Sequence, residues 1–273
     1  MERFEQVEHS IIKKFRRQIW SRFTKALKEF RLVNEGDRIA VCISGGKDSM
    51  LLAKCMQELQ RHGKTDFSLV YLVMDPGYHE ANRQLILENA RQLHIPITMF
   101  ESQIFDIVKD IDTSPCYLCA RMRRGHLYHE AQSLGCNKIA LGHHFDDVIE
   151  TILMSMLYGG EIKTMMPKLH STNFAGMQLI RPLYYVREAD IARWRDENGL
   201  TFLRCACRFT ENLASDLLES KREEVKQLIR RLQAKSPFIE KNIYKSVYNV
   251  NADAVIAYKK HGRRYHFMDA YED

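Results

Sequence analysis

The sequence has no long uncharged apolar run. Among its 273 residues we find no stretch of about 18 apolar residues free of charge, which a membrane-spanning helix would need. Residues 1–5 also lack the apolar core of a signal peptide. We therefore expect a cytoplasmic protein without a membrane partner. With 45% apolar residues the chain can fill a core, which argues against disorder.

The cysteine count also argues against a complete set of disulfide bonds. Seven cysteines are an odd number, and the chain shows no secretory signal. The cysteines must therefore serve chemistry or lie in the core. Cys42, Cys55 and Cys136 stand in apolar strand or helix patterns or in a turn, which is typical of core thiols.

Positive charge exceeds negative charge only modestly. The chain has 41 Lys and Arg against 35 Asp and Glu, a net charge of +6. The cations are grouped, which suits a polyanionic partner because neutralising phosphates releases counterions. A solvated helix face is the alternative, and charge alone does not decide between the two. The groups are Lys13–Arg17, Arg121–Arg124, Arg230–Arg231, Lys259–Lys260 and Arg263–Arg264.

Strands and helices alternate along most of the chain. Residues 9–30 have the apolar spacing of a helix, with basic residues on its other face. Residues 211–250 are charged and helical in pattern. The βαβα order between them predicts an α/β fold, a parallel sheet covered by helices on both faces. We expect strands at 38–43, 67–74, 97–100, 138–141 and 178–181, and helices at 49–60, 79–93, 119–134, 147–158 and 187–198.

The segment Ser44–Ser49 joins the first strand to a helix. Glycines let the backbone approach a ligand closely, the serines add hydroxyl donors, and a helix N-terminus favours an anion. The spacing differs from a Walker A loop and from G-x-G-x-x-G, so neither an ordinary NTPase nor a dehydrogenase follows. We interpret the segment as a phosphate cradle. The alternative is a plain strand-to-helix turn.

Two more segments follow predicted strands. Met74–Gly77 and Gly142–Asp147 should meet Ser44–Ser49 in one crevice, because ligands collect beyond the carboxyl ends of parallel strands. The second segment places two histidines and two carboxylates at a helix start. Three interpretations stay open: a capped helix, a transition-metal site, or a carboxylate that holds Mg²⁺ against a triphosphate.

The remaining cysteines form two short patterns. Cys116 and Cys119 make a C-x-x-C before a basic helix, and Cys205 and Cys207 make a distant C-x-C. A redox pair, a Cys₄ zinc site and an iron-sulfur site are all open. The C-x-C pair is an awkward bite for tetrahedral zinc. A [4Fe-4S] cluster needs only three of these thiols, which leaves one iron open to another ligand.

The hexamer SGGKDS resembles the loop of the PP-loop ATP pyrophosphatases, and GHHFDDVIET is similar to the second signature of PP-loop tRNA-modifying enzymes. This resemblance implies a Rossmann-like fold and cleavage of ATP between its α and β phosphates. It implies catalytic roles for Asp48, Lys47 and Asp147, with Asp147 preferred to Asp146 as the Mg²⁺ or catalytic carboxylate. The implied nucleotide-binding residues are Ser44, Gly45, Gly46, Lys47, Asp48, Ser49, Asp75, Gly142 and His143.

Further stretches extend the likeness from the N-terminal basic helix to about Cys205. With them the chain resembles the iron-sulfur-dependent tRNA 2-thiocytidine synthetases. The resemblance implies that Cys116, Cys119 and a third thiol hold a [4Fe-4S] cluster. Family members usually present that thiol in a C-x-x-C, so Cys205 is preferred here and Cys207 is the alternative. The stretches are Arg121–Tyr128, Lys138–His144, Tyr158–Gly160, Met166–Leu169 and Ile180–Leu183.

The resemblance implies an ATP-dependent tRNA sulfurtransferase. We expect it to adenylate the C2 oxygen of a pyrimidine, cytidine 32 of the anticodon loop, and to replace that oxygen with sulfur. Its cofactors would be ATP, Mg²⁺ and the cluster, and its partners tRNA, a sulfur donor such as a cysteine desulfurase, and a second copy in a homodimer. We divide the chain into a basic helical segment (1–33), a PP-loop domain (34–208) and a helical extension (209–273).

Two rival functions stay open. The first keeps the PP-loop chemistry and acts on a tRNA uridine or on a small molecule. The second is a zinc-bound nucleic-acid-binding protein with a vestigial ATP loop.

Overall fold

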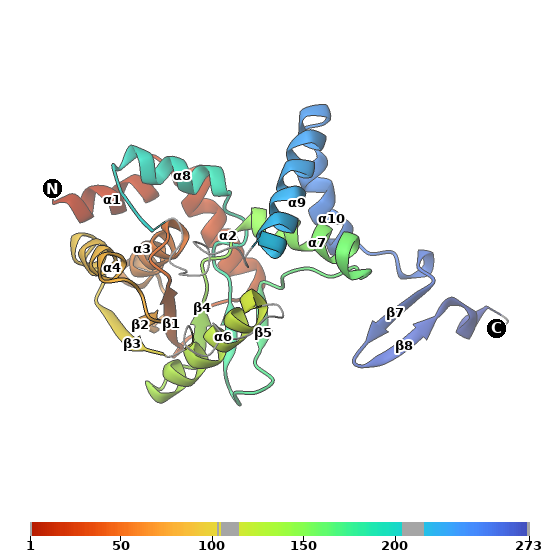
Figure 1. Cartoon of the computed structure of the whole chain (residues 1–273), viewed down its shortest axis with the longest axis horizontal. Coiled ribbons are helices and arrows are strands. Elements are labelled where there is room, and N and C mark those ends of the chain that lie inside the picture. The colour runs from red at the N-terminus through yellow and green to blue at the C-terminus, as the bar shows by residue number, and fades with distance from the viewer. Residues whose placement is uncertain (1, 103, 105–114, 204–215, 272–273) are drawn as a thin grey trace.

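A computed structural model describes residues 2–271 apart from 103, 105–114 and 204–215, and for 115–120 and 216–220 it describes the backbone alone. Figure 1 shows a central sheet with helices packed on it, a helical pair formed by α9 and α10, and a hairpin near the C-terminus. Within the described residues, no helix is both long enough and apolar enough to cross a bilayer.

The central sheet has six strands in the order β3-β2-β1-β4-β6-β5. All neighbouring strands are parallel except β5, which runs antiparallel to β6. This arrangement confirms the expected α/β class. Strand β5 itself was not predicted, because its three residues include no buried one, whereas the equally short β4 and β6 are mostly buried and apolar enough to read as strands. The strands are β1 (Arg38–Ile43), β2 (Ser68–Asp75), β3 (Ile97–Glu101), β4 (Lys138–Ala140), β5 (Lys168–His170) and β6 (Gln178–Ile180).

The helices between the strands begin and end within a few residues of the predicted bounds. The expected N-terminal helix begins earlier and is divided in two by a short π-helical turn. The helices are α1 (Arg3–Ile12), the π-helix η1 (Arg16–Trp20), α2 (Ser21–Phe30), α3 (Lys47–His62), α4 (Glu80–Gln92), α6 (Pro115–Ser133), α7 (Phe145–Gly159), α8 (Glu188–Glu197), α9 (Asp216–Lys235) and α10 (Ile239–Tyr248).

Strand β1 is buried on both of its faces. Ile39 and Val41 belong to a core that includes α1, α3, α4 and α8, whereas Ala40 and Cys42 belong to a core with α6. Side chains alternate between the faces of a strand, so this division places helices on both sides of the sheet. The apolar run that predicted the strand is explained by this double burial.

A buried ion pair fixes the amino end of the sheet. Lys138 Nζ lies 2.5 Å from the Asp37 carboxylate and donates to the Leu32 carbonyl oxygen at 3.0 Å. The two charged residues are only 1% and 4% exposed. The pair joins β4 to the chain that enters β1.

The C-terminal part is helical only in its first half. Helices α9 and α10 match the expected pattern, but two antiparallel strands follow, β7 (Ala257–Lys260) and β8 (Arg263–His266). The helical extension predicted for 209–273 was therefore wrong in this stretch. The turn between the strands has positive φ at both His261 (51°) and Gly262 (80°), the geometry of a tight two-residue hairpin.

We expect Lys138→Met to destabilise the fold by about 3–5 kcal/mol, because it leaves the Asp37 carboxylate buried without its cation. The free energy of unfolding in urea measures the loss. Lys64→Met is the matched control: Lys64 is exposed, so its loss should change stability by about 0.5 kcal/mol or less. A Lys138→Met loss no larger than that of the control would contradict the interpretation.

Candidate active site

The loop Ser44–Ser49 is closed by its own serines. Ser44 N–H donates to Ser49 Oγ at 3.1 Å, and Ser49 Oγ donates to the Gly46 carbonyl oxygen at 2.9 Å. Gly46 then precedes the first turn of the 16-residue helix α3. The N–H groups of that turn have no partner within the helix, so the loop can receive an anion there.

Gly45 has the backbone conformation that glycine favours. Its φ is +81°, and a Cβ at this position would lie 2.7 Å from Ile86 and 2.9 Å from Leu203. The Leu203 N–H also donates to the Gly45 carbonyl oxygen at 3.1 Å. Leu203 thus packs on the loop at Gly45 and is hydrogen-bonded to it.

The second motif packs directly on the first. A Cβ added at Gly142 would lie 3.1 Å from both the Asp48 carbonyl carbon and the Ser49 nitrogen. Only glycine therefore lets the loop after β4 approach the Asp48–Ser49 peptide this closely. The two segments share one crevice at the carboxyl ends of the strands, as their positions in the sequence predicted.

A cavity of about 500 Å³ lies between these loops. Met74 from the end of β2 lines it, and so do Arg123, Arg124 and Leu127 from α6. Asp75 is engaged elsewhere: its carboxylate accepts the N–H groups of Gly77 and Tyr78 at 2.9 and 2.7 Å and closes the turn after β2. The predicted residues that line the cavity are Ser44, Asp48, Ser49, Gly142, His143 and Asp147.

The two aspartates at the start of α7 have different partners. Asp146 binds the Arg187 guanidinium at 3.0 Å and accepts the Glu188 N–H at 2.7 Å, which ties α7 to α8. Asp147 accepts the His144 N–H at 2.9 Å and pairs with Arg222 at 3.0 Å. Burial raises the pKa of Asp147, but the neighbouring His144 and His143, the His144 N–H and the Arg222 guanidinium together lower it further, so the pKa of this carboxyl falls below its ordinary value.

His143 is a neutral imidazole at the cavity wall. Burial lowers its pKa to about 4. Arg181 Nε donates to His143 Nδ1 at 3.3 Å, so the Nε2 atom carries the proton. His143 can therefore donate one hydrogen bond into the cavity.

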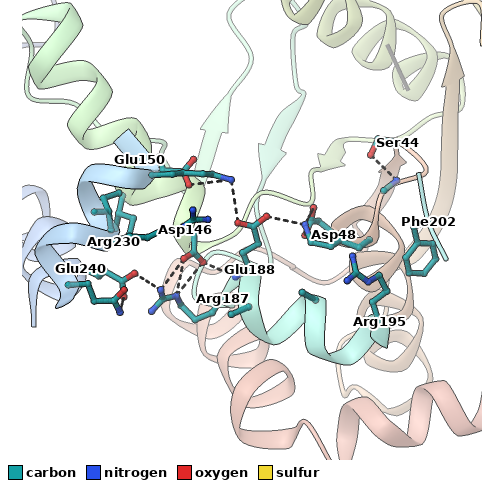
Figure 2. A pocket seen from close by; sticks show the side chains of 18 of the residues that line it. Ser44, Asp48, Asp146, Glu150, Arg187, Glu188, Arg195, Phe202, Arg230 and Glu240 are labelled. Carbon is teal, nitrogen blue, oxygen red and sulfur yellow. Dashed lines mark hydrogen bonds and ion pairs between the residues drawn. The ribbon is translucent and has the colours of Figure 1, made fainter. Parts of the chain in front are cut away.

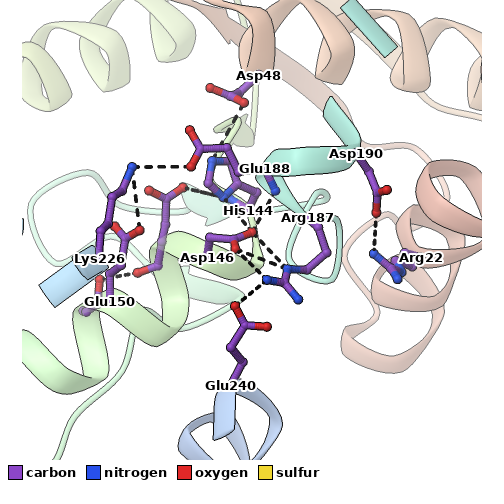
Figure 3. Close-up of polar contacts among 12 residues, drawn as sticks. Arg22, Asp48, His144, Asp146, Glu150, Arg187, Glu188, Asp190, Lys226 and Glu240 are labelled. Carbon is purple, nitrogen blue, oxygen red and sulfur yellow. Dashed lines mark hydrogen bonds and ion pairs between the residues drawn. The ribbon is translucent and has the colours of Figure 1, made fainter. Parts of the chain in front are cut away.

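A chain of charges connects the first loop to helix α9. Lys47 Nζ lies 3.2 Å from Asp48 and 3.2 Å from Glu188, and Glu188 lies 3.4 Å from Lys226. Burial lowers the pKa of Lys47, but these carboxylates raise it further, so Lys47 is a cation. Figure 3 shows the Lys226 side chain beside the carboxylates of Glu188 and Glu150, with His144 in the centre of the view and Asp48 at its top.

Glu150 is the buried end of this chain. Its carboxylate lies 3.4 Å from Arg222 and 3.8 Å from Lys226. Burial raises the pKa of Glu150 to about 7, because both cations stand farther away than a tight ion pair. Sequence reasoning missed four of these residues. Glu150 stands in the second signature but was given no role, and Glu188, Arg222 and Lys226 lie outside the motifs, the last two in α9, which has the pattern of a solvated charged helix.

A larger cavity of about 760 Å³ opens on the other side of Asp48. Figure 2 shows Asp48, Glu188, Arg230 and Glu240 around it. Both cavities are lined by Ser44, Asp48, Glu188 and Lys226. The phosphate cradle therefore stands between two spaces, each large enough for part of a ligand.

Asp48 fits a cation ligand. Its Oδ1 atom is buried and receives no hydrogen bond from the described residues, although Lys47 Nζ lies nearby. Within those same residues, no group of three or more His, Cys, Asp or Glu is placed to hold a metal ion. Mg²⁺ with a triphosphate needs only one or two carboxylates, since phosphate oxygens and water complete its shell.

The cysteine predictions divide between two parts of the chain. The backbone of Cys116 and Cys119 lies in the beginning of α6, whereas Cys205 and Cys207 lie outside the described residues. The three expected core thiols are buried and free, as predicted: Cys42, Cys55 and Cys136. Burial raises the pKa of Cys42 to about 12, so it is protonated although it lines the smaller cavity.

Comparisons with known proteins show which family the chain belongs to. The family model described as PP-loop domain matches residues 15–212. A tRNA-cytidine(32) 2-sulfurtransferase of Pelobacter propionicus is 37% identical over 230 residues, 83% of each chain. One of Geotalea uraniireducens is 35% identical over 237 residues, 85% of this chain and 91% of the relative.

A solved structure shares the fold. The U34-tRNA thiolase NcsA from Methanococcus maripaludis with its [4Fe-4S] cluster matches with a TM-score of 0.65 over 86% of this chain and 80% of that chain, at 18% identity. The two sequence matches establish family membership and not fold alone, because each covers most of both chains at more than one third identity. The chain belongs to the PP-loop family and, within it, to the tRNA-cytidine(32) 2-sulfurtransferases.

Proposed function

We propose that the protein is an ATP-dependent tRNA sulfurtransferase that converts cytidine 32 of the anticodon loop to 2-thiocytidine. The supporting observation is that Gly142 packs directly on the Asp48–Ser49 peptide, so that both signature loops line the same cavity. Family membership points to the same chemistry, since the matched relatives are named for it.

The reaction needs an activated oxygen. The C2 oxygen of a pyrimidine is a poor leaving group, so the first step joins it to the α-phosphorus of ATP. The bond from that phosphorus to the bridging oxygen breaks, and pyrophosphate leaves. Negative charge grows on the departing pyrophosphate, and the N–H groups at the start of α3 lie where they can stabilise it.

Side chains around the loop have separate roles in binding the triphosphate and Mg²⁺. Lys47 and Lys226 offset charge on the triphosphate, and His143 donates to a phosphate or to the nucleoside. Asp48 and Asp147 are the carboxylates for Mg²⁺, which supplies charge neutralisation when bound. Asp146 has no such role, because Arg187 and the α8 backbone occupy its oxygens.

We assign sulfur delivery to thiols near the two cavities. Positions 116, 119, 123 and 127 repeat at helical spacing in α6, and Arg123 and Leu127 line the smaller cavity. Leu203 lines the larger cavity, and Cys205 follows it by two residues in the sequence. Cys116, Cys119 and Cys205 are thus the thiolates we assign to a [4Fe-4S] cluster, with Cys207 as the alternative. When bound, that cluster supplies an iron able to carry the sulfur that replaces AMP.

The same proposal assigns the partners and the parts of the chain. tRNA is the substrate, a cysteine desulfurase is the class of sulfur donor, and the enzyme acts in the cytoplasm as a homodimer. Residues 34–208 perform the chemistry, residues 1–33 add a basic helix, and residues 209–273 help to select the RNA.

We expect Asp48→Asn to lower the rate of tRNA-dependent pyrophosphate release by about 10²–10³-fold, because the cavity loses the negative charge of this carboxylate. The iron content should not change. Asp66→Asn is the matched control, since Asp66 is exposed and away from the loop. Pyrophosphate release at the control's rate would remove Asp48 from the mechanism.

Lys226→Met should lower pyrophosphate release by about tenfold or more, because helix α9 then presents one cation fewer to the triphosphate. Lys226→Arg should restore most of the rate, since it keeps the charge. The dissociation constant for ATP, measured beside the rate, separates a binding defect from a catalytic one. Equal rates for the Met and Arg variants would show that the positive charge is not used.

Cys116→Ala should abolish iron binding and tRNA thiolation while pyrophosphate release continues. Cys205→Ala should have the same effect and Cys207→Ala little effect. Cys136→Ala, a core thiol, is the control. Iron, sulfide and zinc are measured on anaerobically reconstituted protein. Full iron in the Cys116 variant would refute its ligand role, and zinc without iron in the unmodified protein would favour the zinc-bound alternative.

The substrate is tested by nucleoside mass spectrometry. Anaerobic enzyme with ATP, Mg²⁺, sulfide and tRNA should produce 2-thiocytidine at position 32. A thiolated uridine with unmodified cytidine 32 would instead favour the uridine-modifying alternative.

A further inference from the structure

The hairpin of β7 and β8 lies outside the matched family region. The family model ends at residue 212, and the hairpin occupies residues 257–266. Figure 1 shows it extending from the far side of α10, away from the central sheet. No residue of the hairpin lines either of the two cavities.

Like charges face each other across this hairpin. The register pairs Lys259 with Arg264 and Lys260 with Arg263, and all four side chains are exposed. Residues 255–267 contain these four cations and no Asp or Glu. Like charges directly opposite on antiparallel strands are destabilising, so the hairpin stores repulsion that a polyanion would relieve.

The described structure supplies little compensation for that charge. Lys260, Arg263 and Arg264 form no ion pair with any residue in the described part of the chain, and Lys259 interacts only at longer range with Glu161. Elsewhere in the protein most cations near the active site have acidic partners. The hairpin tip is therefore an unneutralised basic surface.

An aromatic pair lies on the same face as two of the cations. Tyr258 and Tyr265 are cross-strand partners whose rings stack at 5.1 Å and 12°. The Arg263 guanidinium lies over the Tyr265 ring at 5.3 Å. Lys260 is the cross-strand partner of Arg263, so it lies on the same face of the hairpin. Exposed aromatic rings beside cations can bind the sugar–phosphate backbone and stack on an unpaired base.

A protein partner is the competing interpretation, because apolar side chains near the hairpin are exposed. Ile256 and Phe267 are 73% and 49% exposed. Protein interfaces, however, have few charges at their centres, whereas the cations here occupy the tip. The charge pattern favours a nucleic acid.

We propose that the β7–β8 hairpin is a second tRNA-binding surface, which holds backbone phosphates of the substrate away from the modified nucleotide. Lys259, Lys260, Arg263 and Arg264 bind the phosphates. This inference rests on the proposed function, because it takes tRNA as the partner.

The test compares two variants of equal net charge. Lys260→Gln/Arg263→Gln removes two hairpin cations, and Lys64→Gln/Arg91→Gln removes two exposed cations at the ends of helices on the other edge of the sheet. Binding of a tRNA transcript is measured from 50 to 200 mM salt. The hairpin variant should bind about tenfold more weakly, with a salt slope smaller by about 2, and the control should match the unmodified protein.

Other measurements decide against the inference. An unchanged affinity in the hairpin variant, or an equal loss in the control, overturns it. So does a loss that accompanies dissociation of a dimer in light scattering, or binding to anionic vesicles that depends on the hairpin while tRNA binding does not. ATP-dependent pyrophosphate release separates the two proposals: an unmodified protein that neither binds tRNA nor releases pyrophosphate with it would refute the function itself.

Discussion

The contact between Gly142 and the Asp48–Ser49 peptide is the constraint on which the site depends. A Cβ at Gly142 would lie 3.1 Å from this peptide, closer than side chains ordinarily pack, so a glycine lets two loops from different strands lie with their backbones together. That approach places His143 and Asp147 beside the phosphate cradle and leaves the Asp48 oxygen facing the cavity. The parallel sheet makes the approach feasible, because β1 and β4 are neighbours and both end at this edge.

The charges around the cradle are balanced before any nucleotide arrives. Lys47, Arg222 and Lys226 pair with Asp48, Asp147 and Glu188, so a triphosphate must compete with carboxylates for the same cations. The pKa of Glu150, about 7, shows that this balance is incomplete at its buried end. A closer approach of Lys226 would lower the pKa of Glu150, and withdrawal of Lys226 toward a nucleotide would raise it. Glu150 can then take up a proton when Lys226 moves away, so no unpaired charge is left buried.

The sequence predicted the parts of the fold that depend on local pattern. The β1 run Arg38–Ile43 and the glycine turn into the next helix were predicted, because burial on both faces and a Gly-Gly pair leave clear local signals. Strand β5 and the hairpin were missed, because the first has no buried residue and the second has the composition of a basic tail. Glu188 and Lys226 could not be predicted, because their roles arise where α8 and α9 meet the first loop, a contact between distant segments that no local pattern records.

Helix α9 links the chemistry to the C-terminal part. Its Arg222 and Lys226 reach Asp147 and Glu188, while its Val225 and Ile229 pack against Ile149 of α7. Helix α10 packs on both α7 and α9 and leads toward the hairpin, and Arg187 binds both Asp146 and Glu240. A tRNA held at the hairpin would thus be attached, through α10 and α9, to the residues that face the triphosphate. Helices α9 and α10 share an apolar core with α7, the helix that follows the second loop. In our proposal, RNA bound at the hairpin is therefore connected to that loop through packed helices and not through a long flexible segment.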